Sequence, residues 1–248
     1  YSSVNGVLFN KDKTVLVRYP AGNERTSYSI PDTVKTVHNR AFLDSYYLVG
    51  VTLPDSITAI EEFAFYSCGK LESVVIPEGV TTIHAYAFSN CAPLASVIIP
   101  DSVTEIGDYA FSYCRQLENA QIGESVVKIG NDAFSHCNAL KEIYIPDSVK
   151  EIGNYAFADC SAATSLYIGE NVETIGEFAF YTSVSINSLT LPATLKTLGK
   201  SAFEKCPLIS NVTIPNNVTV IGDRAFADCT ALANIEIGNN LERIGADA

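Results

Sequence analysis

The sequence contains no methionine and no tryptophan, and it has only three histidines among 248 residues. Because translation starts at methionine, we expect the chain to be a processed or excised piece of a longer protein. Its first four residues carry neither charge nor an apolar run, so no signal peptide is visible. No apolar run approaches the roughly 20 residues that a bilayer-spanning helix needs. We therefore expect no membrane insertion in this segment.

Basic residues are scarce as well. The chain has 16 Lys and Arg against 28 Asp and Glu, for a net charge of −12. The six basic residues within positions 1–40 leave only ten for the rest of the chain. Nucleic acids and anionic membrane surfaces are bound by basic surfaces. We therefore exclude both as partners.

What the sequence does contain is a 23-residue repeat without insertion or deletion. An Ala-Phe pair recurs at that interval, with Phe42, Phe65, Phe88, Phe111, Phe134, Phe157, Phe180, Phe203 and Phe226. Three residues after these positions stand Cys68, Cys91, Cys114, Cys137, Cys160, Cys206 and Cys229, with Ser45 and Ser183 in the other two units. Such a period is the signature of stacked repeats that share one continuous core.

Each unit contains a strand pattern and a helix pattern. Leu71, Val74 and Ile76 are spaced like a short strand with one buried face. Proline then ends the strand in most units, because it cannot donate to a ladder. Further on, Ala110, Phe111 and Cys114 would lie on one side of a helical turn. We therefore predict an α/β solenoid whose coils each comprise a strand, a turn and a short helix.

This unit resembles the leucine-rich repeat, and more narrowly the BspA-like class of bacterial cell-surface proteins. The motif Leu-x-x-Val-x-Ile-Pro-x-x-Val-x-x-Ile-Gly-x-x-Ala-Phe-x-x-Cys is almost complete at residues 94–114 and 140–160. The resemblance implies a right-handed superhelix with one parallel β-sheet on its concave face and short helical turns on its convex face. It also implies an extracellular or surface-attached interaction or adhesion protein. The commoner leucine-rich repeat carries an Asn or Cys just after the strand, and that ladder is missing here.

The two ends of the chain differ from the repeat. Residues 7–19 read as two strands around a polar turn, so we predict that residues 1–26 form a β-hairpin cap over the open end of the solenoid. Residues 27–248 then form about ten repeats of 23 residues. The last one is truncated, because Ala248 stands one residue before the next expected Phe. We expect this end to be a cut rather than a natural finish.

The cysteine column invites a metal or disulfide interpretation. Metal sites favour close pairs such as Cys-x-x-Cys, and none occurs. Helices packed side by side would separate neighbouring cysteines by about 8–10 Å. Disulfides fail beyond roughly 7 Å between Cα atoms. We predict buried, reduced thiols and no metal site.

An acidic column directly follows the strands and comprises Asp32, Asp55, Glu78, Asp101, Glu124, Asp147 and Glu170. Neighbouring carboxylates about 5 Å apart would repel by about 0.8 kcal/mol in water. Hydrogen bonds from backbone N–H groups one to three residues ahead would return about 1 kcal/mol each. We therefore predict turn capping rather than a calcium ladder, and no cofactor.

Two further columns carry no visible chemistry. The glycines read as turn residues that need a permissive backbone, and they are Gly107, Gly130, Gly153, Gly176, Gly199, Gly222 and Gly245. The three histidines, His38, His84 and His136, have no carboxylate or serine partner in register and form no triad. We predict that the protein is not an enzyme.

The outward positions of the strands are the candidate binding site. Their middle portion is an apolar and aromatic stripe made of Val75, Ile98, Gln121, Tyr144 and Tyr167. Tyrosine is favoured at protein interfaces. The alternative explanation is that aromatic and β-branched residues are common in strands whether or not they bind a partner. We predict that a monomer binds a protein on this face, such as a component of the host extracellular matrix, or a glycan.

Two other functions remain open. The chain could be a structural spacer that projects another domain from the cell, and a spacer needs no exposed tyrosine row. It could also be the accessory repeat region of a larger surface enzyme, which the residues beyond Ala248 would decide.

Overall fold

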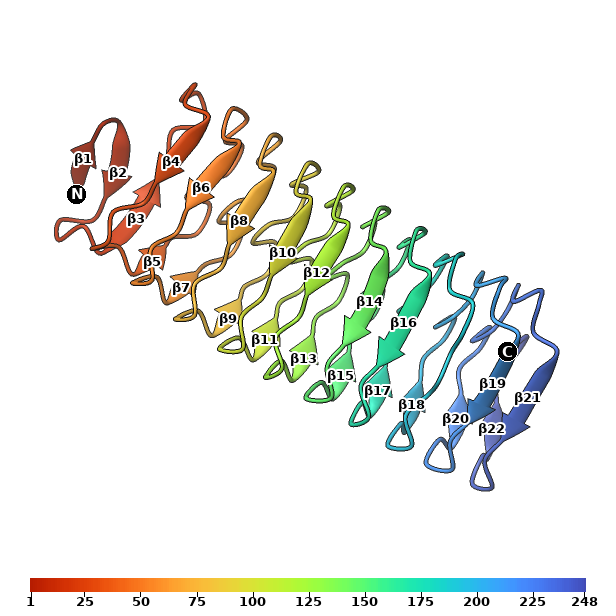
Figure 1. The fold of residues 1–248 in the computed structure, drawn as a ribbon. Helices are drawn as coiled ribbons and strands as arrows, with labels where there is room; N and C mark the ends of the chain where they lie inside the picture. The colour runs from red at the N-terminus through yellow and green to blue at the C-terminus, as the bar shows by residue number, and fades with distance from the viewer.

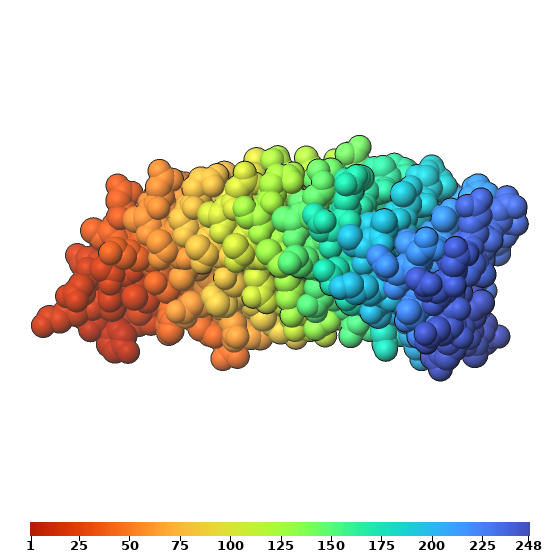
Figure 2. Space-filling model, turned by 90° about the horizontal axis from the view of Figure 1, so that it is seen from below, coloured from red at the N-terminus to blue at the C-terminus, as the bar shows by residue number.

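The computed structural model describes all of residues 1–248 and consists of strands and turns, without a helix. Figure 1 shows each 23-residue unit as one coil, and the coils stand side by side in an elongated row. In Figure 2 the same row is a solid body in which the coils follow one another in chain order. Each coil therefore packs mainly against the coil before it and the coil after it.

The longer strand of each coil lies on one side, which we call the long-strand face. Its parallel strands pair in the 23-residue register, so that Ser96 faces Ser73 and Asn119. The predicted single sheet is in fact divided into three: β12 and β14 belong to different sheets, and residues 187–191, between β16 and β19, form no strand. These sheets comprise β4 (Ser27–Ser29), β6 (Gly50–Thr52), β8 (Ser73–Val75), β10 (Ser96–Ile98) and β12 (Asn119–Gln121); β14 (Glu142–Ile145) and β16 (Ser165–Ile168); and β19 (Asn211–Ile214) and β21 (Asn234–Ile237).

A second parallel ladder, which the sequence did not predict, is built from strands of only two residues. One of them is β9, whose Ile83 is buried while Thr82 is partly exposed. Two residues are too few to show an alternating pattern in a sequence. This ladder comprises β5 (Thr36–Val37), β7 (Ala59–Ile60), β9 (Thr82–Ile83), β11 (Glu105–Ile106), β13 (Lys128–Ile129), β15 (Glu151–Ile152), β17 (Thr174–Ile175), β18 (Thr197–Leu198), β20 (Val220–Ile221) and β22 (Arg243–Ile244).

The third side of each coil, the turn face, is a run of turns around the Ala-Phe pair. The residues two before and two after each Phe have positive φ, for example Tyr109 at 58° and Tyr113 at 61°. Left-handed residues cannot continue a right-handed helix. The N–H of Phe111 instead donates to the carbonyl oxygen of Ala133 in the next coil, at 2.8 Å. The predicted helical turns are therefore wrong, and the structure contains no helix that could cross a membrane.

The phenylalanine column forms the centre of the core. All nine rings are at most 5% exposed, which confirms the predicted burial. Each ring stacks on the next with centroids 4.7 to 5.7 Å apart. The rings thus hold the coils together from one end of the stack to the other, although the segment that carries them is not helical.

The N-terminal residues form three antiparallel strands, β1 (Ser2–Val4), β2 (Val7–Phe9) and β3 (Val15–Arg18). The hairpin of β2 and β3 lies where the sequence predicts two strands, and β1 is an additional strand. The last of the three, β3, pairs in parallel with β5 and so joins the hairpin to the short-strand ladder. The fully buried ring of Tyr19 stacks on Phe42 at 5.1 Å and ends the phenylalanine column.

Candidate interaction surfaces

The predicted binding stripe is a continuous row on the long-strand face. Strand pairing places Ile98 between Val75 and Gln121, and Tyr144 opposite Tyr167. The exposed fractions of the apolar and aromatic members are 72% for Val75, 55% for Ile98, 47% for Tyr144 and 39% for Tyr167. Gln121 is exposed too. The structure therefore brings all five residues to the surface, while their role in binding stays a prediction.

The two tyrosines of the stripe are held in fixed positions. Their rings stack with centroids 5.0 Å apart and 12° between the planes. The hydroxyl of Tyr167 donates to Oδ1 of Asp147 at 2.8 Å. That hydrogen bond is the main cause that raises the pKa of Tyr167 to about 12. The pKa of Asp147 is lowered, first by the backbone N–H of Glu170 and then by Tyr167. A partner would thus meet an aromatic surface that loses little conformational freedom on binding.

The stripe ends beside an opening in the sheet that the sequence did not predict. Residues 187–191 donate no backbone hydrogen bond to a neighbouring coil. A hollow of about 520 Å³ lies between this segment and β16, with Tyr167 in its lining. A second hollow of about 620 Å³ lies on the other side, against β19. The repeat is unbroken at this place, so periodicity alone could not reveal the opening.

The acidic column links some coils through side-chain hydrogen bonds. Oδ1 of Asp101 accepts the N–H of Glu124 at 2.8 Å, and Oδ1 of Asp147 accepts that of Glu170 at 2.9 Å. The predicted bonds within one coil are therefore wrong, because these acceptors bond to the same position one coil ahead. Beside residues 187–191 the column holds Ala193, which has no side-chain oxygen to act as an acceptor.

A second ladder of the same kind, which the sequence did not predict, follows the short strands. Oδ1 of Asp108 accepts the N–H of Asn131 at 2.7 Å, and Oδ1 of Asn131 accepts that of Asn154 at 2.9 Å. Oδ1 of Asn154 accepts the N–H of Glu177. These oxygens satisfy backbone donors between coils. No group of three or more His, Cys, Asp or Glu side chains is arranged to hold a metal ion.

The glycine column exists for a reason other than the predicted one. None of its members has a left-handed φ, so no permissive conformation is needed. A Cβ on Gly153 would lie 2.6 Å from the carbonyl carbon of Gly130 in the preceding coil. A Cβ on Gly176 would meet Gly153 at the same distance. From Gly107 onward, glycine fits this position because successive backbones approach too closely for a Cβ.

Two of the three histidines, His38 and His136, do have carboxylate partners in register, contrary to the prediction. Nδ1 of His38 lies 2.6 Å from Oε2 of Glu61, and Nδ1 of His136 lies 3.4 Å from Oδ2 of Asp159. In each pair the two residues occupy the same position of successive coils. These are exposed or half-exposed pairs between coils rather than parts of a buried site.

The cysteine column is buried in the core, as predicted, with seven free thiols. The expected separation by packed helices is wrong, because turns of successive coils are joined by backbone hydrogen bonds. Each thiol instead donates to the carbonyl oxygen of the Phe in the preceding coil, as Cys91 does to Phe65 at 3.1 Å. Burial is the main cause that raises the pKa of Cys206 to about 12 and also raises that of Cys137.

We expect the native protein to resist thiol reagents, because the reactive species is the thiolate and burial disfavours it. Titration at neutral pH should detect almost no thiol in the folded protein and all seven after denaturation. Cys229, at 8% exposed, should be the first to react. Rapid modification of several cysteines before unfolding would contradict their placement.

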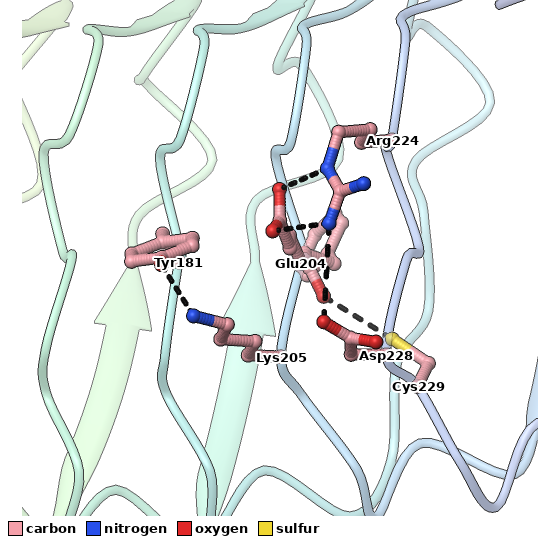
Figure 3. Close-up of polar contacts among 7 residues, drawn as sticks. Tyr181, Glu204, Lys205, Arg224, Asp228 and Cys229 are labelled. Carbon is pink, nitrogen blue, oxygen red and sulfur yellow. Dashed lines mark hydrogen bonds and ion pairs between the residues drawn. The ribbon is translucent and has the colours of Figure 1, made fainter. Parts of the chain in front are cut away.

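The turn face of the C-terminal coils is occupied by the chain's own ion pairs (Figure 3). Arg224 contacts both carboxylate oxygens of the buried Glu204, at 2.9 and 3.2 Å. Asp228 lies 3.9 Å from the same guanidinium, and Lys205 donates to the hydroxyl of Tyr181 at 2.8 Å. The guanidinium of Arg224 is also the main cause that lowers the pKa of Glu204. This part of the surface leaves no buried charge for a partner to neutralise.

Comparison with known proteins agrees with this architecture. The family model of the BspA-type leucine-rich repeat region matches residues 21–141 and 127–248, which together span nearly the whole chain. The chain belongs to the BspA-type leucine-rich repeat family. No curated protein matches it.

Solved bacterial leucine-rich repeat proteins share the fold. A leucine-rich repeat protein of T. pallidum is 29% identical, with a TM-score of 0.62 over 67% of this chain and 80% of that one. A leucine-rich repeat protein of Eubacterium ventriosum is 24% identical, with a TM-score of 0.54 over 92% of this chain. The chain covers 49% of the Eubacterium protein, so it spans about half of that structure.

Proposed function

We propose that this BspA-type repeat protein is a non-catalytic interaction module, secreted or attached to the bacterial surface, that binds a protein partner on its long-strand face. The observation that carries the proposal is the row of Val75, Ile98, Gln121, Tyr144 and Tyr167, which ends at a hollow beside residues 187–191. Family membership supports a repeat scaffold that presents a surface rather than a catalytic centre.

The chemistry of the row suits protein recognition. Tyr144 and Tyr167 offer a large amphipathic surface and have few rotatable bonds that binding must immobilise. Truncation of such residues often lowers the binding free energy by about 2 kcal/mol or more. Val75 and Ile98 extend the row with apolar area that remains in contact with water in the free protein. The hollow next to Tyr167 could receive an anchoring side chain of the partner, which is how the strongest interface contacts are arranged.

The test is the double substitution Tyr144→Ser and Tyr167→Ser, compared with the parent chain on a panel of immobilised extracellular-matrix proteins. We expect binding to weaken more than about 100-fold, since two hot-spot side chains are removed. The free energy of unfolding should change little, because outward strand positions lie outside the core. Binding can be read by surface plasmon resonance and stability by urea denaturation.

The matched control replaces two other exposed tyrosines, Tyr46 and Tyr47, which lie in the turn before β6 rather than on a long strand and should leave binding intact. Undiminished binding by the Tyr144 and Tyr167 double variant, at unchanged stability, would move the site elsewhere. A parent chain that binds oligosaccharides but no matrix protein would favour the glycan alternative. If it binds neither, a spacer or the accessory region of a larger enzyme becomes the better explanation.

A further inference from the structure

The turn face carries an aromatic ladder that takes no part in the proposed function. Its members stand two residues before the core Phe of their coils, and each has φ between 56° and 59°. Neighbouring rings stack 4.5 to 4.6 Å apart and within 6° of parallel. The ladder has two segments, the first of Phe63, Tyr86 and Tyr109 and the second of Tyr155 and Phe178.

One ring is missing between the two segments, where Asp132 takes the ladder position. Asp132 has the same left-handed backbone, with φ of 53°. Its N–H donates to the next coil at 2.8 Å, as do those of Tyr109 and Tyr155. The rings of Tyr109 and Tyr155 are thus two coils, or about 9–10 Å, apart. A planar group midway between them would lie one normal ladder step from each ring.

The outer ends of the ladder show which chemistry these rings attract. The guanidinium carbon of Arg40 lies 5.1 Å from the ring centroid of Phe63, and Nζ of Lys200 lies 5.8 Å from that of Phe178. Both distances are typical of cation–π contacts. The inner ends, Tyr109 and Tyr155, have no such cation, and they face each other across a carboxylate.

Asp132 forms no ion pair with Lys or Arg, whereas Glu204 on the same face is held by Arg224 (Figure 3). Desolvation raises the pKa of Asp132 more than hydrogen bonding from Ser135 and Tyr109 lowers it. Its negative charge is the main cause that raises the pKa of Tyr109. The pKa of Tyr155 is raised most by desolvation and next by the charge of Asp132. These shifts agree with the ladder position of Asp132 between Tyr109 and Tyr155.

The gap opens into a bounded trough. We define this trough by the position one after the core Phe, which holds small buried residues in four successive coils, Ser89, Ser112, Ser135 and Ala158. Large rings close both ends, with Tyr66 packed edge-on against Phe63 and Tyr181 edge-on against Phe178, each at 5.6 Å. The wall opposite the ladder contains Tyr113 stacked on His136 at 4.3 Å. A hollow of about 390 Å³ lies in the N-terminal half of this trough, lined by Tyr66, Tyr86, Ser89, Asn90, Tyr109, Ser112, Tyr113 and Arg115.

We propose that this trough binds an extended peptide segment of a partner protein through one arginine, whose guanidinium inserts between Tyr109 and Tyr155 above Asp132. A guanidinium is planar, so both of its faces can stack on a ring, and its N–H groups can reach the carboxylate. An ammonium group has no flat face with which to fill the gap. The surrounding charge also favours a cation, because Asp108 acts on Asp132 as a like charge and the chain carries a net charge of −12.

The experiment uses the full chain and three acetylated, amidated peptides, Gly-Gly-Arg-Gly-Gly and its citrulline and norleucine analogues, measured by isothermal titration calorimetry. Citrulline keeps the planar shape without the charge, and norleucine keeps neither. We expect the arginine peptide to bind at least about tenfold more tightly than the citrulline peptide, since a charge-assisted contact is lost. The norleucine peptide should not bind.

Two variants locate the site. Asp132→Asn keeps the shape of the gap and should weaken arginine binding about tenfold. Asp132→Tyr should complete the ladder and abolish binding while the melting temperature rises or stays unchanged. The control, Asp55→Asn on the acidic column beside the long-strand face, should bind like the parent chain.

Three results would overturn the proposal. One is no binding of the arginine peptide at millimolar concentration. Another is equal affinity for arginine and citrulline, or for the parent chain and Asp132→Asn. The last is binding of neutral oligosaccharides that Asp132→Tyr blocks, which would assign the trough to sugars. None of these results bears on the long-strand face, so the two sites are tested independently.

Discussion

Phe134→Ala is expected to lower the free energy of unfolding by about 3–5 kcal/mol. The ring of Phe134 is fully buried and stacks on Phe111 and Phe157, at 5.2 Å on each side. Its removal leaves a cavity in the middle of the stack and breaks the column into two parts. In a solenoid each coil is stabilised mainly by its neighbours, so a central defect weakens both halves.

Urea denaturation followed by circular dichroism measures this loss. The control is Val127→Ala in the same coil, whose exposed side chain should change stability by no more than about 0.5 kcal/mol. A loss below about 1 kcal/mol for Phe134→Ala would show that the phenylalanine column is not the core.

Gly153→Ala is expected to cost about 1–3 kcal/mol, the usual range for overpacking. The added Cβ would stand 2.6 Å from the carbonyl carbon of Gly130 and 2.7 Å from the backbone nitrogen of Asn131. Both atoms belong to backbone that is fixed by hydrogen bonds between coils, so neither can move without disturbing the stack. The cause is steric, because Gly153 does not have a left-handed φ.

The matched control is Gly50→Ala in β6, where a new Cβ would meet no atom within 4 Å. Its effect should stay within about 0.5 kcal/mol. The two variants add the same methyl group, so equal effects would argue against close approach as the reason for the glycine column. Thermal unfolding followed by calorimetry can compare them directly.

Much of the candidate site was predictable because a repeat of constant length also fixes which residues become neighbours. The outward stripe from Val75 to Tyr167 follows from counting in steps of 23. The aromatic column of Phe63, Tyr86 and Tyr109 is equally visible in the sequence, and so is its interruption at Asp132. Its stacking was missed because a helical turn would have spaced these rings about twice as far apart.

The opening beside residues 187–191 was not predictable from the period, since this coil keeps its length and its buried Leu189 and Leu191. Ala193 lacks the acceptor present at Asp147 and Asn216, but the glutamates of this column form no such bond either, so its sequence does not single out the opening. Whether one missing side-chain hydrogen bond opens a ladder depends on all the other contacts of that coil, and these exist only in three dimensions.

The sequence by itself determined the stack of coils, the register between them and the buried phenylalanine and cysteine columns, because these follow from periodicity and apolar burial. The tertiary structure decided the backbone of the turn face. There the choice between helix and left-handed turns depends on hydrogen bonds donated to the next coil, and a period in one chain does not specify them. It also decided the role of the glycines, since a 2.6 Å approach between Gly153 and Gly130 arises only when two coils are packed together.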